Sequence, residues 1–271
     1  MVQRITISNR QQQGSLIYLE PDQTHYLCRV LRLGLGDRFI AQNGQGKQWL
    51  AALTEDVSQA DILQALDTRL PQSAPIRLVA ALPKGNAFDQ VVRQTTELGV
   101  THIYPVITER TLLKPSEKRL LRWQRIAQEA SEQCERITVP TIAVPVTFQQ
   151  CLKHPCWEGN NEKSQEGAEE SFRYICVARS EHQSAHLLTR LMAQEANQVR
   201  EDKQVVTHFT SVKPPGVILA IGPEGGWTSN EITDAITYGY EAVSLGSVIL
   251  RSVTAPITAL SLVVAARDLL I

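Results

Sequence analysis

Short alternating runs of apolar and polar residues dominate the first seventy or so residues and predict β-strands. In the segment 36–53, two β-favouring runs flank Asn43 and Gly44. Because Asn and Gly tolerate positive φ, this pair favours a tight turn between antiparallel strands. Just before it, residues 25–33 mix apolar and basic side chains at near-helical spacing, and a short helix there would expose both of its arginines. The N-terminal part is therefore expected to form a small β-barrel.

From residue 76 the hydrophobic period changes, and buried strands alternate with amphipathic helices. A strand at 76–82 leads into a helix that is capped by Asn86 and ends at Gly99. A second strand follows at 102–107, where Pro105 predicts an edge or bulged position. The alternation predicts a mostly parallel sheet flanked by helices. Its remaining elements are expected at about 116–134 (helix), 173–178 (strand), 181–195 (helix), 216–221 (strand), 229–238 (helix), 241–245 (strand) and 254–269 (helix).

Two domains are expected from this change of pattern, at 1–72 and 73–271. A length of 271 residues accommodates them comfortably. Within the second domain, the stretch at about 157–171 carries five glutamates and one lysine among Gly, Asn and Ser. It has little to bury, so we expect an exposed loop insertion.

The composition is that of a folded protein, with 43% hydrophobic residues and only 15 glycines and 13 prolines. No apolar run reaches the roughly 18 residues that a membrane helix needs. The start of the chain lacks the apolar stretch of a signal peptide, so a cytoplasmic location is expected. The five cysteines show no CxxC spacing and no histidine pair at zinc spacing, which favours reduced thiols and no metal site.

The net charge of −1 does not by itself indicate nucleic-acid binding, but basic residues gather locally. One cluster lies within 29–47 and a second within 110–125. The charges alone leave two interpretations open, a solvated surface or a surface that follows a phosphate backbone.

A glycine-rich loop, GPEGGW at 222–227, follows one predicted strand and opens a helix. Thr228 and Glu231 have the spacing of a capping box at the start of that helix. Without Cβ atoms a ligand can lie against backbone groups, and the helix N-terminus favours negative charge. A tight turn between core elements is the alternative. The spacing fits neither the GxGxxG fingerprint nor the Walker phosphate loop.

A second loop, LGSVILRSVT at 245–254, follows the next strand and places Arg251 in an otherwise apolar run. Arginine stays charged in such a setting, so its guanidinium must meet an anion, a carboxylate or carbonyl oxygens. This makes Arg251 the leading catalytic candidate, with an ion pair to a nearby carboxylate as the alternative. Both loops lie at the carboxyl ends of strands, so we expect them to share a pocket.

Four segments together carry a resemblance to a known family: 82–100, 129–140, 221–227 and 245–255. In this order they resemble the bacterial 16S rRNA (uracil-N3)-methyltransferase family of the SPOUT superfamily. The resemblance extends to 25–39, which is similar to that family's PUA-like barrel.

This resemblance implies an α/β domain with a SPOUT-type, mostly parallel sheet and a C-terminal trefoil knot, joined to an N-terminal PUA-like β-barrel. It also implies S-adenosylmethionine (SAM) held in the knot and a homodimer formed through the knot region and the apolar final helix. No metal and no membrane is expected. The residues expected to bind the cofactor are Gly222, Pro223, Glu224, Gly225 and Gly226 on one wall and Leu245, Gly246, Ile249 and Leu250 on the other.

The implied activity is SAM-dependent methylation of N3 of a specific uridine in the 16S rRNA of the small ribosomal subunit. The enzyme must align N3 with the methyl group and help it lose a proton. Arg251 would stabilise the negative charge that spreads onto the uracil carbonyls, and Glu224 or a water that it holds would accept the proton. Glu224 could instead only orient the loop.

Three positions depart from the family pattern, since Gln94 replaces a usual lysine, Val248 a usual arginine and Val253 a usual glutamate. Two alternatives therefore stay open. One is a non-catalytic RNA-binding assembly factor on the same fold, and the other is a SPOUT enzyme acting on ribose or on a tRNA base. The residues expected to contact rRNA phosphates, which position the RNA rather than read its sequence, are Arg29, Arg32, Arg38, Lys114, Lys118, Arg119, Arg122 and Arg125.

Overall fold

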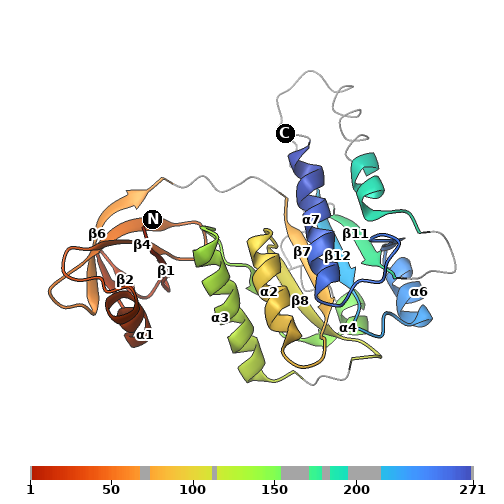
Figure 1. Cartoon of the computed structure of the whole chain (residues 1–271), viewed down its shortest axis with the longest axis horizontal. Coiled ribbons are helices and arrows are strands. Elements are labelled where there is room, and N and C mark those ends of the chain that lie inside the picture. Colours follow the sequence, from red (N-terminus) through yellow and green to blue (C-terminus); the bar gives the residue numbers. More distant parts are fainter. Residues whose placement is uncertain are drawn as a thin grey trace, which may run out of the picture. The chain divides into compact units, whose positions relative to one another are not determined.

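The structure is a computed structural model, which describes most of the chain (Figure 1). The chain packs as two compact units, the first made of Met1–Pro71 and Ala127–Val139 and the second of Gln72–Ile126 and Pro140–Ile271. Lys114, the expected domain boundary at 72–73 and the expected insertion up to residue 170 lie outside the described residues. The described residues are 2–67, 74–111, 115–153, 171–178, 184–194 and 215–269.

The first unit is built on a curled six-stranded sheet, which fits the expected PUA-like domain. Strands β1 (Arg4–Thr6) and β4 (Arg38–Gln42) pair in parallel, whereas all other pairs in this sheet are antiparallel. The predicted hairpin is confirmed, because β4 and β5 pair directly across the turn at 43–46. Ile17, Phe39 and Ala51 are fully buried in the core that the sheet encloses. In spatial order the strands are β1 (Arg4–Thr6), β4 (Arg38–Gln42), β5 (Gln48–Leu53), β6 (Gln59–Leu66), β3 (Leu16–Tyr18) and β2 (Gln12–Gln13).

The short helix predicted in this unit is present, although it begins earlier and changes its winding. An α-helical turn, α1 (Pro21–His25), continues directly into a π-helical turn, η1 (Tyr26–Val30), so the helix ends before the expected residue 33. Leu27 points into the core, while Arg29 and Arg32 are exposed as predicted. Arg32 takes a left-handed conformation with φ +59°, which is unusual for a residue with a side chain.

A later segment of the chain returns to complete this unit. The amide of Gly46 donates to the carbonyl of Ile137 (3.0 Å), and the amide of Val139 donates to the carbonyl of Gly44 (2.9 Å). A Cβ at Gly44 would lie 2.9 Å from the Val139 side chain, so glycine is required both for this contact and for φ +67°. The hairpin turn therefore serves as a docking edge for residues 137–139.

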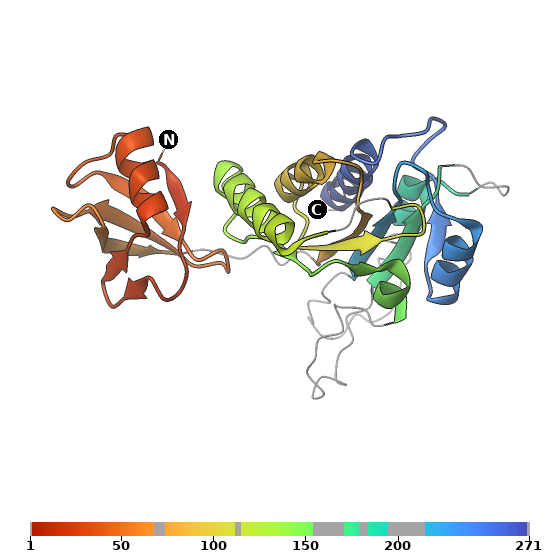
Figure 2. The ribbon, with the colours of Figure 1, turned by 90° about the horizontal axis from the view of Figure 1, so that it is seen from below.

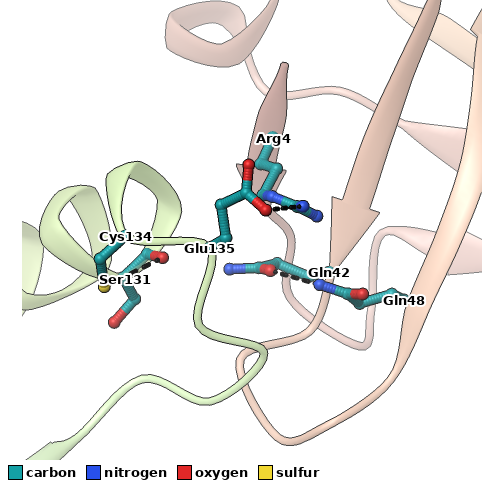
Figure 3. A network of polar contacts seen from close by, with 6 residues as sticks. All are labelled: Arg4, Gln42, Gln48, Ser131, Cys134 and Glu135. Carbon is teal, nitrogen blue, oxygen red and sulfur yellow. Dashed lines mark hydrogen bonds and ion pairs between the residues drawn. The ribbon is translucent and has the colours of Figure 1, made fainter. Parts of the chain in front are cut away.

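Polar side chains fasten the end of helix α3 (Glu117–Gln133) and the residues after it to the sheet (Figure 3). Arg4 forms an ion pair of 2.7 Å with Glu135, which follows α3. Within the sheet, the buried Gln48 of β5 donates to Gln42 of β4 at 3.0 Å. Beside them the Thr6 amide donates to the Glu132 carboxylate at 2.7 Å. Burial raises the pKa of Glu132, and the bond from Thr6 opposes that rise only in part.

The raised pKa of Glu132 predicts a pH-dependent loss of stability. The folded protein holds this proton more tightly than the unfolded chain does, so stability falls as the pH rises above 4.5 through the raised folded value. Glu132→Gln keeps an acceptor for the Thr6 amide and removes the charge. We expect its unfolding midpoint to rise relative to wild type across this range in thermal melts. Glu55→Gln, at an exposed site of the same unit, is the control, and an equal trend in both variants would contradict the assignment.

The second unit contains a sheet in which every described strand pair is parallel, as predicted. The central strands β7 and β12 are buried along their whole length, which explains their continuous apolar sequence. The two-residue strand β9 (Thr141–Ile142) pairs with β8 beside this path. In spatial order the strands are β10 (Val146–Thr147), β8 (His102–Ile107), β7 (Ile76–Ala81), β12 (Gly216–Ile221), β11 (Ser171–Cys176) and β13 (Glu241–Val243).

Helices cover both faces of this sheet (Figure 2). On one face α2 (Ala87–Glu97) packs against α7 (Thr254–Asp268), and on the other α4 (Phe148–Lys153) packs against α6 (Ser229–Thr237). The described part of the helix expected at 181–195 is helical over 187–194. No helix in the described stretches is long and apolar enough to cross a membrane.

The position of Pro105 corrects one expectation. Strand β8 is not an edge strand, because β7 lies on one side of it and β9 and β10 lie on the other. Strand β9 pairs with residues 102–103 of β8, and β10 pairs with 106–107. Pro105 therefore faces the gap between these two short strands, where its missing N–H costs no ladder hydrogen bond.

The connection after β13 sets up the functional site. Strand β13 lies at the sheet edge next to β11, whereas α7 packs against β12 and β7. The residues between β13 and α7 must therefore pass the carboxyl ends of β11 and β12. This route is compatible with the expected trefoil knot, which stays a prediction.

Candidate active site

A cavity of about 310 Å³ lies at the carboxyl ends of β11, β12 and β13. The glycine-rich loop after β12 and the loop after β13 both line it, so the two loops share a pocket as expected. The end of β11 contributes Cys176 and the loop after it contributes Val177 and Ala178, which the sequence did not single out. All nine residues expected to bind the cofactor line this cavity: Gly222, Pro223, Glu224, Gly225, Gly226, Leu245, Gly246, Ile249 and Leu250.

Trp227 anchors the glycine-rich loop in the core. Its side chain is 8% exposed, its ring centroid lies 4.5 Å from that of Phe148, and its Nε1 donates to the carbonyl of Cys176 at 3.1 Å. A Cβ on Gly222 would lie 3.2 Å from the indole, so the chain needs glycine to pass beside it. Gly226 then turns with φ +70°. The glycines of this loop therefore line the cavity with backbone alone, and one aromatic side chain anchors the loop.

The capping box predicted at the start of α6 is confirmed. The Glu231 amide donates to the Thr228 hydroxyl at 3.3 Å, and the Glu231 carboxylate accepts the Thr228 amide at 2.9 Å. Glu231 is only 3% exposed, and its second oxygen accepts the amide of Glu109 at 3.0 Å. This buried carboxylate therefore also binds the loop that follows β8.

Arg110, in that same loop, lines the cavity although sequence reasoning counted it only among the basic residues. Its Nη1 donates to the carbonyl of Gly225 and, at 3.4 Å, to that of Trp227. Its sequence position could have indicated this role, because Arg110 follows the buried strand β8 of a parallel sheet and so lies at the same sheet edge as the other two loops.

Glu224 reaches out of the glycine-rich loop to the loop after β7. Its carboxylate accepts the backbone amide of Lys84 at 3.0 Å, and the neighbouring Gly85 carbonyl accepts a hydrogen bond from Arg119 at 2.8 Å. Glu224 is exposed and lines the cavity. Its carboxylate thus connects the glycine-rich loop to the loop after β7.

Arg251 is exposed and lies between Leu250 and Ser252, which both line the cavity, while it does not itself. Within the part of the chain that the structure describes, the Arg251 guanidinium has no ion-pair partner, so the alternative of an ion pair finds no support there. Among the departures from the family pattern, Val248 is 68% exposed and lines the cavity, and Val253 is the N-cap of α7.

The cavity is lined mainly by glycines and apolar residues, with two charged residues among them. The charged residues among the described lining are Arg110, whose guanidinium donates to loop carbonyls, and Glu224, whose carboxylate accepts the Lys84 amide. The volume falls at the lower end of the range usual for small-molecule sites. Burial raises the pKa of the Cys176 thiol to about 12, so this lining residue stays protonated and is no nucleophile.

The basic residues expected to contact RNA divide between the two units. Arg29, Arg32 and Arg38 are exposed on the first unit. On the part of α3 that belongs to the second unit, Lys118, Arg122 and Arg125 are exposed and Arg119 is half-buried. Arg122 already pairs with Asp89 at 2.8 Å.

The chain is similar to known families of RNA-modifying proteins. The RNA methyltransferase domain family matches residues 70–264, and the RNA methyltransferase PUA domain family matches residues 19–58. Ribosomal RNA small subunit methyltransferase E of Synechocystis sp. is 38% identical over 96% of this chain and 77% of its own length. The Bacillus subtilis protein of the same name is 26% identical over 92% of this chain and 90% of its own length.

A solved structure shows the same fold over the full length of the chain. Ribosomal RNA small subunit methyltransferase E from Neisseria gonorrhoeae, bound to S-adenosyl methionine, has a TM-score of 0.75 and 27% identity, covering 99% of this chain and 98% of its own. A Legionella pneumophila structure in complex with the bound cofactor SAM has a TM-score of 0.75 and 29% identity, with 98% of both chains covered. The chain belongs to the ribosomal RNA small subunit methyltransferase E family of RNA methyltransferases.

Proposed function

We propose that this protein transfers the methyl group of SAM to N3 of a uridine in the 16S rRNA of the small ribosomal subunit. The observation that carries the proposal is the glycine-walled cavity at the carboxyl ends of β11, β12 and β13, in a chain of this family. The family's SAM-bound structure from Neisseria gonorrhoeae supports SAM as the methyl donor. When bound, SAM supplies an electrophilic methyl group.

The protein's own residues must hold the acceptor base and manage its proton. Arg251, exposed beside the cavity and without an ion-pair partner among the described residues, is assigned to the uracil carbonyl oxygens, where it stabilises the charge left by N3 deprotonation. Glu224, or a water that it holds, is assigned as the proton acceptor. Because the Lys84 amide binds one carboxylate oxygen of Glu224, the other oxygen is the one available for the proton.

Methylation with labelled SAM followed by nucleoside analysis tests the proposal. We expect 3-methyluridine from the 16S rRNA, with naked RNA and assembled small subunits compared as substrates. A 2′-O-methylated nucleoside or a modified tRNA would replace the proposal with a related enzyme. RNA binding without methyl incorporation would show a non-catalytic assembly factor. The family's usual arginine at position 248 and glutamate at position 253 would then be the first residues to restore.

Glu224→Gln is expected to reduce the preference of the pocket for SAM over S-adenosylhomocysteine. SAM carries a sulfonium charge that the thioether of S-adenosylhomocysteine lacks, and Glu224 is the one acidic residue among the described lining residues. For an exposed carboxylate, the loss in SAM affinity should exceed the loss in product affinity by about two- to fivefold. Isothermal titration with both ligands measures this ratio. Equal losses would mean that Glu224 acts only through its contact with Lys84.

The basic residues on both units are assigned to rRNA phosphates, which position the substrate. They are Arg29, Arg32, Arg38, Lys114, Lys118, Arg119, Arg122 and Arg125.

A homodimer through the knot region is also part of the proposal. Val248 and Ile249 in the loop after β13 and Leu269 after α7 are exposed apolar side chains, which is consistent with a partner surface there. Sedimentation of the full chain as a single-chain species would contradict this assignment.

A further inference from the structure

We propose that Arg110 is a positioning residue that fixes the glycine-rich wall of the SAM pocket. The inference rests on the proposed function, because it names what shapes that pocket. Arg110 lies in the loop after β8, outside the two loops that carry the recognised motifs. It would act on the cofactor through the glycine-rich loop.

The first observation is the double contact of its guanidinium. Arg110 Nη1 donates to the carbonyls of Gly225 and Trp227, which flank Gly226. Gly226 has φ +70°, and its amide donates to the Pro223 carbonyl at 2.9 Å, so residues 223–226 form a β-turn. A permanently charged group that binds the carbonyls on both sides of a turn holds that turn in one conformation.

The second observation is that the preceding residue binds the start of the helix that follows the loop. The amide of Glu109 donates to the buried carboxylate of Glu231, which also accepts the Thr228 amide. The β8 loop is itself braced, since the Thr108 amide donates to the Thr111 hydroxyl at 3.0 Å. One short segment therefore contacts the glycine-rich loop through Arg110 and the first turn of α6, which follows that loop, through Glu109.

The third observation is steric. A Cβ on Gly225 would lie 3.1 Å from Cδ of Arg110, and the three heavy atoms nearest to it would all belong to Arg110. Gly225 is not among the left-handed glycines, so its backbone accepts alanine. The absence of a side chain at 225 therefore leaves room for Arg110, and the two positions should be coupled.

This arrangement also explains how a cation lines a pocket for a positively charged ligand. The Arg110 charge is directed to two carbonyl oxygens, which partly neutralise it. Removing the side chain would release both carbonyls and leave the turn at Gly226 without its brace. The expected consequence is weaker cofactor binding rather than weaker RNA binding.

The test compares Arg110→Ala and Arg110→Lys with Arg93→Ala, an exposed arginine on α2 without an assigned role. By titration calorimetry, SAM affinity should fall about tenfold in Arg110→Ala, as expected for lost charge-assisted hydrogen bonds. The KM for SAM should rise while the KM for RNA stays unchanged. Arg110→Lys should recover part of the loss, because an ammonium can still donate to one carbonyl. Unchanged SAM binding in Arg110→Ala would overturn the inference.

A double-mutant cycle with Gly225→Ala separates this role from a direct contact. Gly225→Ala should weaken SAM binding in the wild-type background and much less in the Arg110→Ala background, because the clash is then gone. Equal costs in both backgrounds would mean that residue 225 touches the cofactor directly, and would overturn the coupling.

Hydrogen exchange of the ligand-free protein tests the inference independently of activity. Amides of 222–228 should exchange faster in Arg110→Ala than in wild type or Arg93→Ala, and unchanged exchange would count against a positioning role. If wild type neither binds SAM nor methylates RNA, the proposed function fails, whereas the exchange result still decides whether Arg110 holds the loop.

Discussion

Arg251→Ala is expected to lower turnover by about 10²–10³-fold, the cost of removing a group that stabilises developing negative charge. The effect should fall on kcat rather than on SAM affinity, because Arg251 does not line the cavity. The nucleoside assay at saturating SAM measures turnover, and titration calorimetry measures cofactor binding.

Two controls define what this result means. Arg251→Lys keeps a positive charge without the planar fork and should retain part of the activity. Arg93→Ala removes an exposed arginine elsewhere and should turn over like wild type. An unchanged rate in Arg251→Ala would remove this residue from the mechanism and leave the uracil charge to another group.

Trp227→Ala is expected to destabilise the second unit by about 3–5 kcal/mol, as for other large-to-small replacements of buried aromatic residues. The substitution removes the packing on Phe148 and the hydrogen bond to Cys176, and it empties the space beside Gly222. Because this side chain anchors the cavity wall, SAM binding should be lost together with stability. Thermal unfolding with and without SAM measures both effects.

Trp227→Phe separates the ring from its N–H. It keeps an aromatic ring in the core and leaves the Cys176 carbonyl without its donor, so we expect a cost of about 1 kcal/mol and retained SAM binding. A Trp227→Ala protein that unfolds at the wild-type temperature would show that the wall does not depend on this anchor.

Elements with strong local signals were predictable from the sequence. The strand expected at 76–82 is Ile76–Ala81, and the helix expected at 254–269 is Thr254–Asp268. The capping box of Thr228 and Glu231 is present as predicted. Hydrophobic period and caps act over a few residues, so they can be recognised without knowledge of the tertiary structure.

Features that depend on distant contacts were not predictable. The return of Ala127–Val139 to the first unit rests on backbone bonds to Gly44 and Gly46, which no pattern within either segment indicates. The two-residue strands β9 and β10, which together pair with β8 on either side of Pro105, are too short for a periodic signal.

In the candidate site too, residues with local sequence signals were predictable and residues placed by distant contacts were not. Motif residues around the two predicted loops line the cavity, whereas Arg110 and the residues after β11 reach it only because parallel strands end at one edge. Their contacts with the loops involve backbone carbonyls and amides. Every residue type carries these groups, so the amino-acid sequence does not indicate which of them will be in contact. The sequence therefore indicated the loops but not what holds them.

The split of the first unit into two stretches of chain has a consequence for biosynthesis. When Pro71 has left the ribosome, the hairpin turn at Gly44 and Gly46 still lacks the partners that it later finds at Ile137 and Val139. The N-terminal unit can therefore reach its native state only after a whole intervening portion of the other unit has been translated. Folding of this unit must wait because its second stretch is translated only after residues 72–126. A pause in translation before residue 139 would leave this docking edge uncovered.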